Sequence, residues 1–222
     1  MSYAIRIHET GGPEKMRWEE VEVGSPGPGQ VLVRNTAVGL NFIDVYQRTG
    51  LYPLSLPLTL GMEGAGVVEA VGPKVKEFKV GDRVAYANPI GSYAEVCLRP
   101  VERLVKIPAG VSDRIAAAIM LKGMTAWYLV KRTYKVRKGD TILVHAAAGG
   151  VGQILCQWAK HLGATVIGTV GSDAKAVLAK KAGCKHVIVT SREKFVDRVK
   201  EITKGKGVPV VYDGVGKDTF MD

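Results

Sequence analysis

Four apolar runs in the second half of the chain constrain its fold more than any other feature. Each run is apolar almost without a break, and a segment long enough for a helix separates it from the next. The runs are TILVHA (141–146), TVIGTV (165–170), HVIVT (186–190) and VPVVYD (208–213). Strands have this composition when helices cover both faces of a parallel sheet. The pattern therefore predicts an α/β unit in which parallel strands alternate with helices.

A glycine-rich turn, HAAAGGVG at residues 145–152, follows the first of these runs. After it, apolar residues recur at helical spacing on one face, and Gly163 follows as a stop signal. The residues of this face are Val151, Ile154, Leu155, Trp158, Ala159 and Leu162. The start of a helix leaves backbone N–H groups unpaired, so a strand, turn and helix in this order can form an anion site.

The spacing of the turn, Ala147-x-Gly149-x-x-Gly152, matches the dinucleotide-binding fingerprint with alanine in place of the first glycine. Gly149 would let the backbone approach a pyrophosphate, and Gly152 would let the helix pack closely on the strand. We therefore predict a dinucleotide site, with a purely structural tight turn as the alternative. The turn residues assigned to the cofactor are Ala148, Gly149, Gly150, Val151 and Gly152.

The second apolar run favours NADPH over NADH. An NAD site usually carries an acid about 20 residues beyond the glycines, where it binds the ribose hydroxyls, and here that position falls at Gly168–Thr169. Gly171 and Ser172 can begin the next helix, and Lys175 lies in its first turn, where a cation suits a 2′-phosphate. Asp173 argues for NADH unless it is a helix-capping acid. The alternative for Lys175 is an exposed helix lysine.

The first half of the chain follows a different pattern. Up to about residue 110, short runs such as YAIRI, WEEVEV and VLVRNTAVG are separated by turns. This is typical of a compact, mostly antiparallel β domain. The join is expected in the helical stretch from Ala116 to Lys131, so we place the first domain at 1–115 and the second at 116–222.

Composition and the start of the chain favour a globular cytoplasmic protein with no membrane span. No apolar stretch approaches the roughly 20 residues that cross a bilayer, and the start of the chain lacks a secretion signal. The cysteines Cys97, Cys156 and Cys184 are odd in number without metal-like spacing, so we expect reduced core thiols. Lysine and arginine outnumber acids by 31 to 21, but much of the excess lies at helix ends.

The string GDTILVHAAAGGVGQILCQWAK resembles quinone oxidoreductases of the zeta-crystallin type, which are zinc-independent members of the medium-chain dehydrogenase/reductase superfamily. Other stretches in the expected order extend the resemblance over essentially the whole chain. They include GLNFIDVYQRTGLYP, GMEGAGVVEAVG, VGDRVAY, LKGMTAWYL, GTVGS and VVYDGVG. The resemblance implies a GroES-like catalytic domain followed by a Rossmann domain, a homodimer, and NADPH-dependent reduction of a quinone.

The residues at two positions argue against a zinc site. Zinc alcohol dehydrogenases of this superfamily have a cysteine where this chain has Asn41, a histidine where it has Met62, and a four-cysteine lobe that is missing here. Without a tetrahedral ligand set we expect no metal and an acceptor that needs no Lewis acid. Quinones fit this requirement, and α,β-unsaturated carbonyls, reduced by an enone or alkenal reductase, are the alternative. The alternative for Met62 and Glu63 is a loop beside the active site with no chemistry.

By the resemblance, Asn41, Phe42, Asp44 and Tyr46 lie near the nicotinamide and Tyr52 lines the quinone site. Asn41, Asp44, Tyr46 and Tyr52 are therefore the candidate catalytic residues, and Asn41, Phe42 and Tyr46 also count as cofactor contacts. Structural roles are the alternative, since Asn41 makes a sound N-cap and Asp44 a favourable first-turn acid. The two tyrosines could bind a quinone oxygen or be ordinary half-buried side chains.

The resemblance adds further cofactor contacts. Thr125 and Tyr128 match positions close to the cofactor, and the backbone of Val215 borders it. Thr190 is also a cofactor candidate, although many relatives carry a tyrosine near the adenine ribose at this position. Ser191 and Arg192 could replace the contacts to the adenosine that this tyrosine makes in relatives.

A lens crystallin or RNA-binding protein is the non-enzyme alternative, but the sequence has no aromatic-and-basic stripe or recognised RNA module.

The chain stops just after the fourth predicted strand, whereas the resemblance implies a six-stranded sheet and a terminal segment. We therefore expect a truncated form that retains weak nucleotide binding, has little reductase activity and associates through its uncovered sheet edge.

Overall fold

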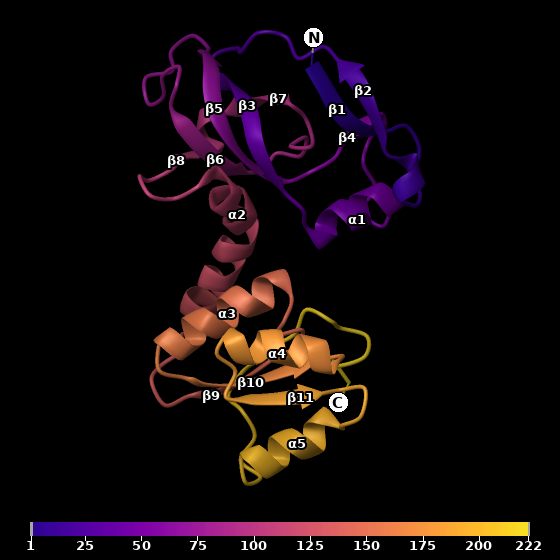
Figure 1. Ribbon diagram of the computed structural model, residues 1–222, viewed down its shortest axis with the longest axis vertical. Coiled ribbons are helices and arrows are strands. Elements are labelled where there is room, and N and C mark those ends of the chain that lie inside the picture. The colour runs from indigo at the N-terminus through magenta and orange to yellow at the C-terminus, as the bar shows by residue number, and fades with distance from the viewer. Residues whose placement is uncertain (1, 222) are drawn as a thin grey trace. The chain divides into compact units, whose positions relative to one another are not determined.

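The computed structural model describes residues 2–221. The chain divides into two compact units between Leu121 and Lys122. This division lies inside helix α2 (Asp113–Tyr128), the helix that also contains the boundary proposed at residues 115 and 116. Figure 1 shows the β-rich first unit and the α/β second unit.

The first unit contains two antiparallel sheets. A five-stranded sheet has the order β7-β3-β5-β6-β8, and a three-stranded sheet has the order β2-β1-β4. The strands are β1 (Ser2–Ile7), β2 (Arg17–Val21), β3 (Gln30–Gly39), β4 (Leu58–Thr59), β5 (Glu63–Val71), β6 (Arg83–Ala87), β7 (Val96–Pro100) and β8 (Leu104–Lys106). Every strand pair in both sheets is antiparallel. The predicted antiparallel β domain is therefore confirmed.

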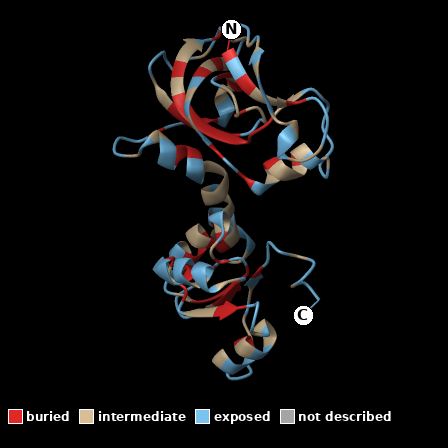
Figure 2. Ribbon diagram, turned by 45° about the vertical axis from the view of Figure 1, so that its right-hand side comes forward, coloured by how far each residue is buried: buried red, intermediate tan, exposed pale blue. Residues whose placement is uncertain are grey.

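Alternating apolar side chains build the core of this unit. On β3, Val31 and Val33 are fully buried, and Val68 of β5 and Val84 of β6 pack in the same cluster. Alternation places these residues on one face of the pleated sheet, and buried strand segments stand out in Figure 2. The connections include two short 3₁₀ helices (Pro13–Lys15 and Val101–Arg103) and helix α1 (Phe42–Thr49), which follows β3 closely.

The second unit contains a parallel four-stranded sheet with the order β11-β10-β9-β12. Its elements are the π-helical segment η3 (Leu129–Thr133), β9 (Thr141–Val144), α3 (Gly150–His161), β10 (Thr165–Val170), α4 (Asp173–Lys181), β11 (His186–Val189), α5 (Phe195–Ile202) and β12 (Val211–Tyr212). The order third, second, first, fourth is that of a doubly wound dinucleotide-binding sheet. The four predicted strands are present, although the last apolar run pairs only at Val211–Tyr212.

Helix α3 has the predicted buried face. Leu155 and Ala159 are fully buried, and Trp158 packs against the same core cluster. Gly163, just beyond the end of the helix, has φ +85°, which a glycine adopts without the steric cost that a side chain brings. The helix therefore begins and ends where the sequence pattern predicts.

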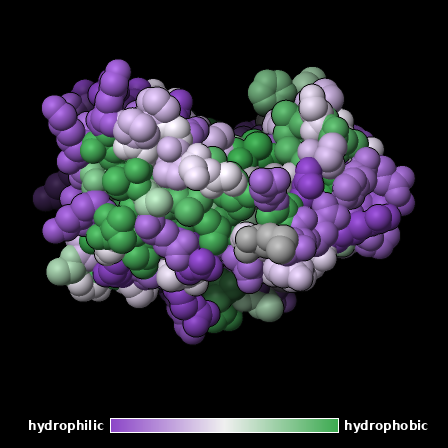
Figure 3. Space-filling model, turned by 90° about the horizontal axis from the view of Figure 1, so that it is seen from above, coloured by the Kyte–Doolittle hydropathy of each residue, from purple (hydrophilic) through white to green (hydrophobic). Residues whose placement is uncertain are grey.

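Two composition-based expectations can be compared with the structure. Cys97, Cys156 and Cys184 are free and buried, as predicted. In the part of the chain that the structure describes, no helix is long and apolar enough to cross a membrane. Exposed apolar side chains do occur, and Figure 3 shows them among hydrophilic ones on the face that it presents.

Candidate functional site

The glycine-rich turn places the start of helix α3 beside the carboxyl end of the parallel sheet. Gly149 precedes the helix in an extended conformation, with φ −75° and ψ 172°. The first amides of a helix have no acceptor four residues earlier, so they are available to an anion. A β-carbon at Gly152 would lie 2.4 Å from the carbonyl oxygen of Ala146. The absence of a side chain at Gly152 therefore allows the close packing that the fingerprint predicts.

The alanine that replaces the first fingerprint glycine is accommodated by a glycine on the neighbouring strand. Ala147 is fully buried. Its β-carbon would lie 2.7 Å from a β-carbon at Gly168 of β10, so only one of the two positions has room for a methyl group. This departure from the fingerprint therefore leaves the turn intact.

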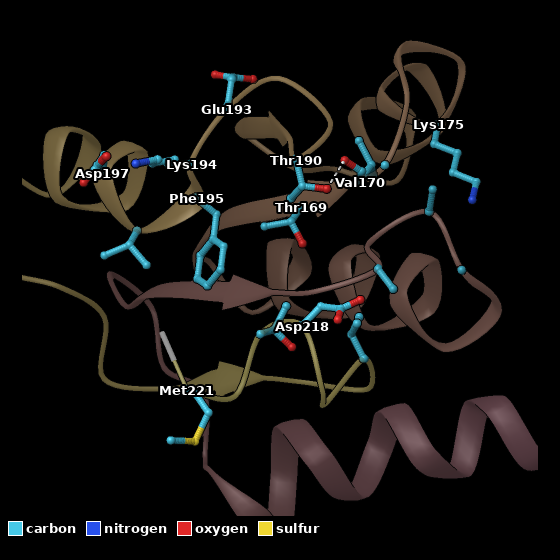
Figure 4. A pocket seen from close by; sticks show the side chains of 17 residues that line it. Thr169, Val170, Lys175, Thr190, Glu193, Lys194, Phe195, Asp197, Asp218 and Met221 are labelled. Carbon is cyan, nitrogen blue, oxygen red and sulfur yellow. Dashed lines mark hydrogen bonds between the residues drawn. The ribbon is translucent and has the colours of Figure 1, made fainter.

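A cavity of about 990 Å³ lies at this end of the sheet, and all its lining residues belong to the second unit. Figure 4 shows several of them, with Lys175 on the opposite side from Glu193 and Asp197. The end of β10 contributes Thr169 and Val170, followed by Gly171, and none of these is a carboxylate. The carboxylates that line the cavity, those of Glu193, Asp197 and Asp218, come from later segments of the chain and not from the end of β10.

Ser172, rather than Asp173, is the N-cap of helix α4. The Ser172 hydroxyl oxygen accepts the backbone N–H of Lys175 at 3.4 Å. Asp173 is the first residue of the helix, and both its carboxylate oxygens bind Arg192 Nη1, at 2.6 and 2.7 Å. The interpretation of Asp173 as a capping acid was wrong, because Ser172 is the N-cap. Asp173 instead pairs with Arg192 and does not line the cavity, so it places no free carboxylate beside Lys175. The Lys175 side chain is exposed and lines the cavity.

The remaining cofactor candidates of this unit lie near the same cavity or on α2. Thr190 lines it, with its hydroxyl donating to the Val170 carbonyl at 3.3 Å. Val215 also lines it, and its N–H donates to the Asp213 carboxylate at 2.8 Å. Burial would raise the pKa of Asp213, but hydrogen bonds from Thr219, Val215 and Gly216 together hold it below its usual value. The ionised carboxylate of Asp213 therefore holds the turn that carries Val215 through these hydrogen bonds.

Two candidates, Thr125 and Tyr128, lie on the part of helix α2 that belongs to the second unit. Tyr128 is 46% exposed, so its ring is accessible to a ligand. The other candidates, Asn41, Phe42, Asp44, Tyr46 and Tyr52, are all in the first unit, at or near helix α1.

Within the first unit, Asn41 and Asp44 belong to a buried polar cluster. The Asp44 carboxylate accepts the backbone N–H of Asn41 at 2.8 Å and the hydroxyl of Tyr93 at 2.7 Å. Burial, followed by this bond to Asp44, raises the pKa of Tyr93 well above its ordinary value. The cluster therefore keeps Tyr93 protonated and fixes the start of helix α1.

Glu63 completes this cluster, and sequence reasoning missed it. It is the first residue of β5 and is fully buried, not a loop residue without a role. Glu63 Oε1 accepts from Asn41 Nδ2 at 2.9 Å. A β-carbon at Gly39 would lie 2.3 Å from this oxygen. The glycine at the end of β3 was the available signal, because it leaves the space that the carboxylate fills.

An exposed aromatic group lies beside the cluster. The rings of Phe42 and Tyr46 meet edge to face with centroids 5.1 Å apart, and those of Tyr46 and Tyr52 are 5.3 Å apart. Phe42 is 70% exposed and Tyr52 is 50% exposed. The structure therefore brings three predicted residues together as an accessible aromatic surface.

The residues at the two positions that are zinc ligands in alcohol dehydrogenases do not fit that metal. The side chain of Asn41 is engaged with Glu63, and the thioether of Met62 accepts from Gln47 Nε2 at 3.4 Å. Among residues 2–221, no group of three or more His, Cys, Asp or Glu side chains could hold a metal ion.

Comparison with known proteins identifies the family. The chain is 54% identical to a quinone oxidoreductase of Pseudomonas aeruginosa, over 99% of this chain and 68% of the relative. It is also 54% identical to a 2-haloacrylate reductase of a Burkholderia species, over 100% of this chain and 68% of that protein.

The chain belongs to the quinone oxidoreductase family. A solved structure of the Escherichia coli quinone oxidoreductase complexed with NADPH matches it with a TM-score of 0.96 and 49% identity, covering 98% of this chain and 67% of that one. Models of an alcohol dehydrogenase GroES-like domain and of a zinc-binding dehydrogenase match residues 27–109 and 150–222. The predicted combination of a GroES-like domain and a Rossmann-type parallel sheet is therefore confirmed.

Proposed function

We propose that this member of the quinone oxidoreductase family is an NADPH-dependent reductase that transfers a hydride to a quinone. The observation that carries the proposal is the second-unit cavity, where a dinucleotide-type turn and Lys175 line one site and the end of β10 has no carboxylate. A carboxylate there would repel a 2′-phosphate, whereas a lysine attracts it. The NADPH complex of the E. coli relative supports this choice of cofactor.

The residues of the turn fit the cofactor. The unpaired amides at the start of α3 would bind its pyrophosphate. Gly149 leaves the backbone approachable, and Gly152 allows the start of the helix to pack closely on the turn. Lys175 would bind the 2′-phosphate, with Thr190 and Val215 beside the adenosine and nicotinamide portions. When bound, NADPH supplies the hydride.

In the first unit, the chain's own residues would bind and orient the acceptor. Glu63 holds the amide of Asn41, so this side chain has a defined orientation. The rings of Phe42, Tyr46 and Tyr52 form an accessible surface on which a planar quinone can pack, and the tyrosine hydroxyls can donate to its oxygens. Solvent or one of these hydroxyls supplies the proton that completes the reduction. None of these steps needs a metal.

Cofactor preference is tested by titrating the protein with NADPH and NADH and following nicotinamide fluorescence. NADPH should bind more tightly than NADH, and Lys175→Ala should weaken NADPH alone. Lys180→Ala is a matched control, since Lys180 is also an exposed lysine of α4 but does not line the cavity. Equal affinity of the unaltered protein for the two cofactors would refute the phosphate-site argument.

A reductase of conjugated carbon–carbon double bonds is the second candidate. The 54% identity to a 2-haloacrylate reductase favours it, because that relative is named for an activated alkene. Hydride acceptance at such a double bond requires no metal either. Side-by-side NADPH oxidation with a benzoquinone, 2-chloroacrylate and a short alkenal decides between the candidates, and faster turnover of either alkene would reverse the ranking.

Assembly as a homodimer, which the resemblance implies, and a cytoplasmic location, which was expected from the sequence, are further proposals. Sedimentation velocity at several protein concentrations tests the first, and a single species with the mass of one chain at all of them would refute it. Fractionation of the source cells tests the second.

A further inference from the structure

Ala146, within the glycine-rich turn, has an unusual backbone conformation. Its φ is +50°, in the left-handed region that residues with a β-carbon rarely adopt. Its carbonyl oxygen accepts the N–H of Gly149 at 2.8 Å. The same oxygen lies against Gly152, where a β-carbon would approach it to 2.4 Å. The conformation of Ala146 therefore determines where the turn places the start of helix α3.

Thr169, near the end of β10, holds both neighbours of Ala146. Its hydroxyl oxygen lies 2.8 Å from Nδ1 of His145, within hydrogen-bond distance. Its carbonyl oxygen accepts the backbone N–H of Ala147 at 3.0 Å. Thr169 and His145 are only 3% and 4% exposed, so water does not compete for their side-chain hydrogen bond.

The surroundings of His145 restrict its ring further. The ring of Phe195 meets it edge to face, with centroids 4.8 Å apart. The backbone N–H of His145 donates to the Tyr212 carbonyl at 3.0 Å, which ties the residue to β12. A strained backbone conformation persists only where several surrounding contacts hold it in place. The contacts of His145 and Ala147 hold the strained backbone of Ala146 in this way.

We propose that the His145–Thr169 hydrogen bond is a positioning contact that holds Ala146 left-handed and thereby presents the first amides of α3 to the pyrophosphate of the cofactor. The inference rests on the proposed function, since it requires a bound dinucleotide. It differs from the role of Lys175 in one respect that can be measured. NADPH and NADH share the pyrophosphate, so loss of this contact weakens both to the same extent.

Thr169→Val tests the contact directly. Valine keeps the shape and the strand preference of threonine but lacks the hydroxyl. Affinity for NADPH and for NADH should each fall about tenfold, the size of effect that loss of one buried hydrogen bond produces, and their ratio should stay unchanged. Thr169→Ser retains the hydroxyl and should keep most of the affinity. His145→Leu removes the same bond from the other side and should reproduce the Thr169→Val result.

Ala146→Gly provides the rescue. Glycine adopts a positive φ without steric cost, so the turn no longer depends on the contact to hold it. In the Thr169→Val background, Ala146→Gly should restore most of the affinity for both cofactors. If the Thr169 hydroxyl only stabilised the unit as a whole, Ala146→Gly would not restore the affinity for the cofactors.

The outcomes separate this inference from the proposed function. Normal affinity for both cofactors in Thr169→Val and His145→Leu, loss of NADPH binding alone, or failure of Ala146→Gly to rescue would each overturn the positioning role while the proposed function stands. If the unaltered protein bound neither cofactor, the proposed function would fall, and this inference with it. Circular dichroism of every variant verifies that it is folded.

Discussion

Glu63 and Asn41 are joined by a hydrogen bond of 2.9 Å from the amide of Asn41 to one carboxylate oxygen of Glu63. The other carboxylate oxygen accepts the backbone N–H of Leu121 at 2.7 Å. Both donors meet an acceptor only because the buried side chain carries two oxygens. These two hydrogen bonds of Glu63 therefore join the start of α1 and helix α2 to strand β5. The first of them also fixes the side-chain amide of Asn41, which we place at the substrate site.

Glu63→Gln should destabilise the protein by about 1–3 kcal/mol, because the new NH₂ group must face one of these two N–H donors, which leaves buried donors unsatisfied. The measurement is urea unfolding followed by circular dichroism. Glu69→Gln is the control on the same strand, since Glu69 forms an exposed pair with Arg34 and should cost less than about 1 kcal/mol. Equal losses in the two variants would contradict the role of Glu63.

Gly149 and Gly152 should respond differently to alanine. At Gly152 a β-carbon would lie 2.4 Å from the Ala146 carbonyl oxygen, so Gly152→Ala must move the start of α3 and should lower both stability and cofactor affinity. At Gly149 the nearest atom would be at 3.1 Å and φ is −75°, which alanine tolerates. Gly149→Ala should therefore lower cofactor affinity with a smaller loss of stability than Gly152→Ala causes. Thermal unfolding and NADPH titration measure the two effects, and equal destabilisation would contradict the distinction.

Gly168 and Ala147 should compensate for each other. A β-carbon at Gly168 would lie 2.7 Å from the β-carbon of Ala147 and 2.7 Å from the sulfur of Cys184. Overpacking of this kind typically costs about 1–3 kcal/mol, so Gly168→Ala should lower the unfolding midpoint. The double variant with Ala147→Gly removes one of the two clashes and should recover part of the loss. A double variant no more stable than Gly168→Ala would show that the Cys184 contact dominates.

The stability of the protein should fall in mild acid through His145. Burial lowers the pKa of His145 below its ordinary value of 6.5, against the opposing effect of Asp213. Below pH 6.5 the unfolded chain therefore binds more protons at this residue than the folded chain does, and the free energy of unfolding decreases until the pH reaches the lowered pKa. Well above pH 6.5 neither state binds this proton, and the effect is absent.

His145→Asn removes the titrating group while an amide N–H remains to bond Thr169. Its stability, measured by urea unfolding from about pH 8 to about pH 5, should therefore fall less steeply than that of the unaltered protein below pH 6.5. Parallel curves over the whole range would exclude His145 as the source of the acid sensitivity.

Local sequence determined much of the second unit. The glycine turn, the buried face of α3, the stop at Gly163 and the start of α4 beside Ser172 all depend on residues a few positions apart. Backbone preferences and helix capping act over this range, so these features could be predicted from the sequence. The apolar runs likewise predicted the strands and their parallel arrangement, because burial on both faces excludes polar side chains.

Tertiary structure decided the polar contacts that support the sites. Glu63 meets Asn41 and Leu121 across 22 and 58 positions, and His145 meets Thr169 across 24. No local preference places a carboxylate or an imidazole in a core. Burial of either is favourable only when the fold brings a partner within hydrogen-bond distance, and that distance depends on how strands and helices far apart in the sequence pack together.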